Sequence, residues 1–216
     1  MPNPRRPAAR SIFLNCPFDE QYKAHFTALI FAVHDCGFYA RCALEISDSG
    51  QSRFEKICQL IRECRCGIHD LSRTSLDPIT HLPRFNMPLE LGLFLGARVF
   101  ASRRRPSSKV CLVMDTEQYR YRDFCSDLAG FDIEGHNGES LQIVRVVRNW
   151  LRTNQVEQEN IPSGTHIFDR YKQFLEELPE LCRPDHLDPN ALIFPEYVSL
   201  VEAWLLEHDW HAVETP

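Results

Sequence analysis

The feature that most limits how this chain can fold is a repeated alternation of short apolar runs with segments of helical periodicity. The run from Lys109 to Asp115 is apolar through its middle, which is typical of a central parallel strand buried on both faces. Strands that alternate with helices predict a parallel sheet that is covered by helices on both sides. The chain is therefore expected to form an α/β domain.

The predicted elements follow one another through the first 152 residues. Strands are expected at residues 11–15, 38–45, 66–70, 109–115 and 131–136. Helices are expected between them, ending near residues 36, 64, 101 and 129, and a further helix is expected at 140–151. The second helix is predicted to bury Phe54, Ile57, Cys58, Ile61 and Cys64. We predict a flavodoxin-like three-layer fold whose parallel sheet has the strand order 2-1-3-4-5.

The character of the chain changes after residue 152. A polar stretch at 153–164 predicts a linker, and two amphipathic helical segments follow at about 166–178 and 194–208, separated by Pro179, Pro184 and Pro189. We divide the chain into a disordered lead-in at 1–10, an α/β domain at 11–152 and a helical C-terminal appendage at 165–216. The apolar stripes of the appendage either pack on the α/β domain as a cap or form a surface for a partner or a homo-oligomer.

Composition argues against several classes of protein. The net charge is −6 and the basic cluster at 103–105 is short, so no nucleic-acid partner is expected. The sequence has neither an apolar run of about 20 residues, as a membrane span needs, nor a secretory signal at its start. Its nine cysteines are scattered and odd in number, which favours reduced thiols in the cytoplasm over disulfides or a metal site.

The stretch from Asp70 to Glu90 contains the strongest candidates for chemistry. Asp70 ends a predicted strand, a polar loop follows, and the next helix is expected to start near Met87 with Asn86 as its N-cap. Glu90 is placed in the first turn of that helix, where the helix dipole should keep its carboxylate ionised. Glu90 also lies among apolar residues, where an idle carboxylate is costly to bury. The alternative is a glutamate that only complements the dipole.

Other polar residues are predicted at the same edge of the sheet. Asn15 ends the first strand and could hold a ribose or base, and Arg84 and Asn86 could close over a ligand unless they belong to a plain surface loop. Asp70 could bind a sugar or orient a leaving group, or it could form an Asx turn. We predict that Asn15, Asp70 and Glu90 converge on one cleft.

A second group follows the second predicted strand. It consists of Ser47, Ser49, Gly50 and Arg53. Hydroxyls, backbone N–H groups and an arginine at a helix start suit a phosphate group, although an ordinary helix cap explains them as well. His34 and His69 lie in apolar runs and are interpreted as core residues.

Two segments resemble a known family. The segments Ile12-Phe-Leu-Asn-Cys-Pro-Phe18 and Gly67-Ile-His-Asp70-Leu-Ser, with Asn86-Met-Pro-Leu-Glu90-Leu-Gly92, are similar to the nucleoside 2-deoxyribosyltransferase-like group. That group is related in fold to TIR domains, including bacterial TIR-like antiphage-defence proteins that cleave or rearrange NAD. The resemblance covers about residues 11–151. This chain departs from the group in its longer, Arg-containing loop, its C-terminal helices and its lack of a clear Gly-rich phosphate loop.

The resemblance implies an enzyme that cleaves or transfers at an N-glycosidic bond. Positive charge builds on the sugar as that bond breaks, so a carboxylate beneath C1′ can stabilise it or attack it, and Glu90 is the candidate. NAD or a related nucleotide would be the substrate, with no separate cofactor and no metal. The alternative is an inactive TIR-like domain that senses a nucleotide or binds a protein partner.

Overall fold

The computed structural model describes residues 8–74, 81–82, 84–101, 109–154 and 161–209 of the chain. They form an α/β fold with an all-parallel five-stranded sheet in the order β2-β1-β3-β4-β5, as the sequence predicts for a flavodoxin-like three-layer protein. The strands are β1 (Ser11–Asn15), β2 (Tyr39–Arg41), β3 (Cys66–Asp70), β4 (Val110–Asp115) and β5 (Ile133–Gly135). Most of the predicted lead-in (1–7) and half of the predicted linker (155–160) lie outside the described residues.

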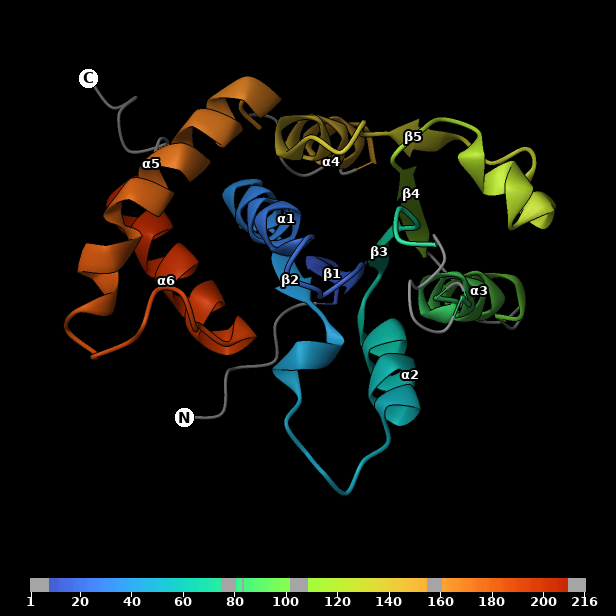
Figure 1. Ribbon diagram of the computed structural model, residues 1–216, viewed down its shortest axis with the longest axis horizontal. Coiled ribbons are helices and arrows are strands. Elements are labelled where there is room, and N and C mark those ends of the chain that lie inside the picture. Colours follow the sequence, from blue (N-terminus) through green and yellow to red (C-terminus); the bar gives the residue numbers. More distant parts are fainter. Residues whose placement is uncertain (1–7, 75–80, 83, 102–108, 155–160, 210–216) are drawn as a thin grey trace.

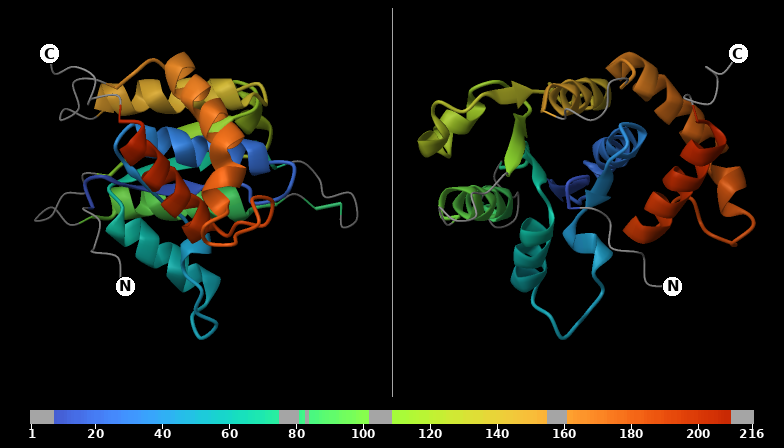
Figure 2. Two further views of the ribbon diagram at one scale, coloured as in Figure 1. Left: turned by 90° about the vertical axis from the view of Figure 1, so that its left-hand side faces the viewer. Right: turned by 180° about the vertical axis from the view of Figure 1, so that it is seen from behind.

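Helices cover both faces of the sheet. The helices α1 (Lys23–Asp35) and α4 (Ser140–Asn154) pack together on one face, and α2 (Arg53–Glu63) and α3 (Asn86–Val99) pack together on the other (Figure 1). Two further helices, α5 (Gly164–Cys182) and α6 (Phe194–Glu207), lie against the outer side of α1 and α4, as Figure 2 also shows. No helix in the described ranges is long and apolar enough to cross a membrane.

The C-terminal helices share their core with the α/β domain. The ring of Phe31 on α1 lies 5.5 Å from that of Phe174 and 5.7 Å from that of Trp204, measured between centroids. Arg170 of α5 forms an ion pair with Asp35 of α1, with Nη2 3.1 Å from Oδ1. The appendage is therefore packed as a cap on α1, which leaves the eight residues from Ala28 to Asp35 buried without interruption.

Several local predictions are corrected by the structure. Phe54 is 53% exposed instead of buried, because the apolar face of α2 is formed by Ile57, Leu60 and Ile61. The predicted strand at 38–45 contains only the short β2, followed by a 3₁₀ turn at Ala43–Glu45. The predicted helix at 119–129 is likewise two 3₁₀ turns, at Arg120–Asp123 and Ser126–Leu128.

Helix ends also differ from their predicted positions. The N-cap of α2 is Ser52, whose side chain accepts from the N–H of Glu55 in a capping box, and neither Ser47 nor Ser49 has that role. The helix α3 begins at Asn86 with Phe85 as its N-cap, one residue earlier than predicted. The helix α5 continues through Pro179, where the missing N–H falls in its last turn.

Candidate functional site

The carboxyl ends of the parallel strands form a buried polar edge. Asn15 ends β1, Asp70 ends β3, Asp115 ends β4, and His136 follows β5. Each of these four side chains is at most 2% exposed. Pairing of Asn15 with His69, and of Asp70 with Met114, brings the strand ends into line, so the edge is a product of parallel topology.

Asp70 is enclosed by hydrogen-bond donors. Its Oδ1 accepts from the N–H of Ser72 at 2.8 Å, which forms an Asx turn, and its Oδ2 accepts from the hydroxyl of Tyr22. Nε2 of His136 lies 3.2 Å from the same Oδ2. Burial opposes the charge of Asp70, but His136, Ser72 and Tyr22 outweigh it and lower the pKa of the carboxyl group. The geometry makes Asp70 an ionised anchor rather than a group that faces a ligand.

The partners of Asp70 belong to a wider buried network. Nδ1 of His136 accepts from the N–H of Gly138 at 3.1 Å, and its Nε2 faces Oδ2 of Asp70. The ring of His25 packs edge-on against Tyr22, with centroids 5.3 Å apart, and its Nδ1 is 2.7 Å from Oγ of Ser140. Burial and the neighbouring His136 lower the pKa of His25. The network therefore joins the end of β3 to α1 and α4.

Asn15 connects the sheet to the start of α3. Its Nδ2 donates to the carbonyl oxygen of Met87 at 2.8 Å and lies 3.0 Å from Nδ1 of His69. Burial lowers the pKa of His69 to about 3, so that ring is neutral and its Nδ1 can accept the amide proton. Asn15 thus fixes the first turn of α3, three residues before Glu90. His69 is a core residue, as its apolar surroundings in the sequence predict.

Glu90 differs from these groups because no residue that the structure describes is paired with it. It lies in the second turn of α3, is 7% exposed, and makes no hydrogen bond or ion pair with any described residue. Burial raises the pKa of Glu90 to about 7, although the positive charge of Arg53 acts in the opposite direction. Glu90 therefore lies one turn later than predicted, where the helix dipole is weaker, and burial shifts its pKa against the predicted ionisation.

The structure brings Asp70 and Glu90 to the same neighbourhood. Burial raises the pKa of the Cys16 thiol well above its usual range, and the charges of Cys42, Asp70 and Glu90 raise it further. Cys16 directly follows Asn15 at the end of β1. The two carboxyl groups therefore both act on the segment that follows β1, one through an enclosed network and the other from the face of α3.

Arginines surround the loop after β1. Nε of Arg73 lies 3.2 Å, and Nη1 of Arg84 lies 3.4 Å, from Oδ2 of Asp19. Arg84, predicted to close over a ligand, is thus held by Asp19. The guanidinium of Arg53 lies 5.7 Å from the ring centroid of Phe18, and its charge acts on Glu90.

The other predicted binding residues lie away from these contacts. Ser47, Ser49 and Gly50 belong to the exposed loop before α2, where the N–H of Gly50 donates to Oδ1 of Asp48 at 2.8 Å. Asn86 is exposed as the first residue of α3. Arg53, the fourth residue predicted to bind a phosphate, differs from these because its positive charge acts on Glu90.

Several site residues were missed at the sequence level. Asp115 accepts from Nε of Arg120 at 2.9 Å, and Nη2 of Arg120 donates to the carbonyl oxygen of Leu71 at 2.9 Å. Three buried oxygen atoms beside this pair, Ser72 Oγ, Thr74 Oγ1 and Asp115 Oδ2, have no hydrogen-bond partner among the described residues. Asp115 and His136 could both have been found from their places at the ends of predicted strands, whereas Tyr22 had no comparable signal. Unpaired buried oxygens call for a polar ligand or water.

The described residues contain no cluster of His, Cys, Asp and Glu side chains that could hold a metal ion. All nine cysteines are free thiols. Comparison with described protein families gave no match, and comparison with characterised proteins gave none either. A functional proposal for this chain therefore rests on the geometry at the carboxyl ends of the strands.

Proposed function

We propose that the chain cleaves or transfers at the N-glycosidic bond of a nucleotide, with NAD as the leading candidate and Glu90 as the catalytic carboxyl group. The observation that carries this proposal is the placement of Glu90. It is a buried carboxyl group with no hydrogen-bond or ion-pair partner in the described part of the chain, beside the carboxyl ends of the strands where α/β proteins bind ligands. A buried carboxyl group is costly unless something compensates it, and a cationic sugar centre would do so.

The reaction would use Glu90 in its ionised form. The nicotinamide of NAD is cationic, so when the C1′–N bond breaks the electron pair moves to nitrogen and neutral nicotinamide leaves without added protons. The positive charge then lies on C1′, where the carboxylate of Glu90 stabilises it or bonds to it before water or another acceptor attacks. Because the pKa of Glu90 is about 7, turnover should rise as the pH increases through that value.

The remaining polar groups fit roles in binding. Arg53 already acts on Glu90, and the guanidinium groups of Arg73 and Arg84 lie at the Asp19 segment, so cations are available for the phosphates. The unpaired oxygens of Ser72, Thr74 and Asp115 could accept from ribose or amide donors. Asn15 and Asp70 act as positioning residues, since each is already hydrogen-bonded within the protein.

A nucleotide-sensing domain without catalysis is the second candidate. It is favoured by the enclosure of Asp70, because the site then offers one free carboxyl group instead of the predicted pair. Binding through the arginines and the unpaired oxygens would not require Glu90 to react. This candidate predicts affinity for a nucleotide with no release of its base.

Incubation of the purified protein with NAD and a panel of nucleotides, followed by chromatography of the released bases, tests the proposal. Calorimetric titration of the same compounds detects binding without turnover. The Glu90→Gln variant should lose base release and keep binding, while Glu176→Gln, at an exposed position on α5, should retain both. Binding without release by the parent protein would favour the sensor. Absence of both binding and release would reject the nucleotide site.

A further inference from the structure

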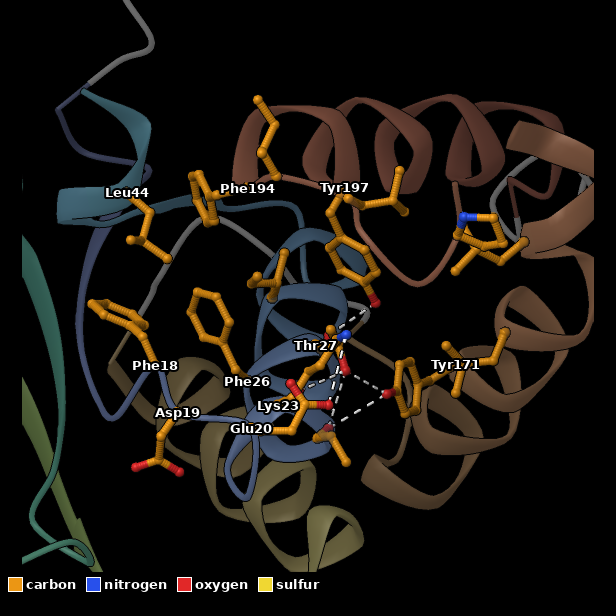
Figure 3. Close-up of a pocket in the computed structure, with 17 residues that line it drawn as sticks. Phe18, Asp19, Glu20, Lys23, Phe26, Thr27, Leu44, Tyr171, Phe194 and Tyr197 are labelled. Atoms are coloured by element: carbon orange, nitrogen blue, oxygen red, sulfur yellow. Dashed lines mark hydrogen bonds and ion pairs between the residues drawn. The ribbon is translucent and has the colours of Figure 1, made fainter. Parts of the chain in front are cut away.

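A cavity of about 680 Å³ lies between α1 and the two C-terminal helices. Figure 3 shows Phe18, Phe26, Leu44 and Phe194 gathered at one end of it, with Tyr171 and Tyr197 directed at Thr27. Asn15, Asp70 and Glu90 do not line this cavity, which meets the candidate active site only at Phe18 and Asp19 of the loop after β1. Its volume is in the range of sites that hold one small organic molecule, which is roughly 300–1,000 Å³.

The aromatic walls offer ring surfaces at contact distance from one another. The rings of Phe18 and Phe26 meet edge-on with centroids 5.1 Å apart, and those of Phe26 and Phe194 are inclined by 24° with centroids 6.1 Å apart. These three rings come from the loop after β1, from α1 and from the start of α6. Aromatic surfaces arranged in this way favour a ligand that has rings of its own.

Four polar side chains of the cavity, those of Lys23, Thr27, Tyr171 and Tyr197, are already paired with the protein. Oγ1 of Thr27 is 2.8 Å from the hydroxyl of Tyr171, and the hydroxyl of Tyr197 donates to the carbonyl oxygen of Thr27 at 3.3 Å. Nζ of Lys23 donates to the carbonyl oxygen of Asn190 at 2.9 Å. A charged ligand would have to displace these contacts, so the cavity is suited to an uncharged one.

Three apolar side chains that line the cavity are exposed to solvent. Leu44, Leu175 and Ile193 are 43%, 39% and 60% exposed, and they come from three separate segments around the opening. Apolar side chains that are exposed singly are ordinary, but a group around a cavity is typical of a ligand site. A bound apolar molecule would cover these side chains and fill the space behind them.

We propose that this cavity is a binding site for an uncharged small molecule with a largely apolar, ring-containing body. The aromatic walls, the paired polar groups and the apolar rim all favour that class of ligand. A nucleotide carries phosphate charges and therefore falls outside this class of ligand. The proposal is independent of the proposed function, because binding here can be measured without turnover.

The neutral fluorescent probe N-phenyl-1-naphthylamine tests the proposal with the full chain. We expect a saturable rise in its fluorescence that Ala24→Trp weakens by about tenfold or more, a loss of roughly 1.4 kcal/mol in binding. Ala24 is an exposed residue of α1 that lines the cavity, so an indole there occupies its space. The matched control is Ala203→Trp on α6, which is also exposed but does not line the cavity and should bind the probe normally.

A second cavity variant keeps the test decisive if Ala24→Trp does not fold. Leu175→Trp narrows the cavity from α5, and Leu206→Trp is its control, because Leu206 is 82% exposed outside the cavity. Melting temperatures identify any variant that does not fold. The absence of saturable binding to the parent protein, or equal weakening by cavity and control variants, would overturn the proposal. A parent dimer that Ala24→Trp or Leu175→Trp dissociates, measured by light scattering, would show instead that a second copy occupies the cavity.

Discussion

Asp70 and Glu90 are both buried carboxyl groups near the carboxyl edge of the sheet, but their pKa values are displaced in opposite directions. Burial opposes the charge of each. At Asp70 the interactions with His136, Ser72 and Tyr22 outweigh the effect of burial, so the pKa of its carboxyl group is lowered. Glu90 has the distant charge of Arg53 alone, and its pKa is raised to about 7. Hydrogen-bond donors, and not burial, therefore distinguish an anchoring carboxylate from one that is available for chemistry.

The largest expected effect tests whether Glu90 reacts. Glu90→Gln should lower the release of base by about 100-fold or more, because it removes the charge that faces the developing cation. Its melting temperature should not fall below that of the parent, since Glu90 has no partner among the described residues to lose. Turnover and thermal unfolding of both proteins provide the measurement. Unchanged turnover in Glu90→Gln would remove the glycosidase mechanism.

The pH dependence of stability should reveal the cost of burying Glu90. The unfolded chain releases this proton near pH 4.5, whereas the folded protein holds it up to about pH 7. Stability should therefore fall as the pH rises through that window, by at most about 3 kcal/mol for the full displacement. The difference between parent and Glu90→Gln in urea unfolding isolates this contribution from other groups. A difference that does not vary with pH would show that Glu90 is ionised in the folded protein.

Asp70 should respond in the opposite sense. Its folded pKa is lowered, so its contribution to stability is present above the pKa of the unfolded chain and is lost as the pH falls. Asp70→Asn should cost about 2 kcal/mol of unfolding free energy near neutral pH, because an amide cannot satisfy the three donors. Turnover per folded molecule should fall less than in Glu90→Gln. A greater loss of turnover with normal stability would make Asp70 the reacting group.

The smallest effect separates the stability of α3 from the chemistry of Glu90. A Cβ added at Gly92 meets nothing within 4 Å, so Gly92→Ala should stabilise α3 by roughly 0.5–1 kcal/mol. At Gly67 the same change would place Cβ 2.8 Å from the Phe94 ring and should destabilise the protein. Chemical unfolding of both variants measures these effects. Turnover of Gly92→Ala should equal that of the parent, and a change would mean that motion of α3 contributes to catalysis.

The sequence predicted the features that depend on periodicity and topology. Asn15 and Asp70 were placed at one edge because parallel strands end together, and the strand order followed from the alternation of elements. The capping box of Ser52 and Glu55 has a readable spacing and was overlooked in favour of Ser47 and Ser49.

Other features of the site could not be predicted because they depend on tertiary contacts. The enclosure of Asp70 requires Tyr22 and His136, which are 48 and 66 residues away in the chain. His136 ends a predicted strand, but nothing in the spacing of Tyr22 connects it to Asp70. The state of Glu90 depends on the neighbours that exclude water from it, and helix position alone gave the wrong sign. Phe54 was misplaced because an apolar residue near a helix start can lie off the buried face.

The burial of the second half of α1 has a consequence for how the protein is made. Its eight consecutive buried residues, Ala28 to Asp35, are covered partly by α5 and α6, which are synthesised well after α1. Synthesis proceeds at about 5–20 residues per second, so several seconds pass before α5 and α6 can pack on the outer face of α1. During that interval the nascent chain exposes an apolar helix that a chaperone could bind.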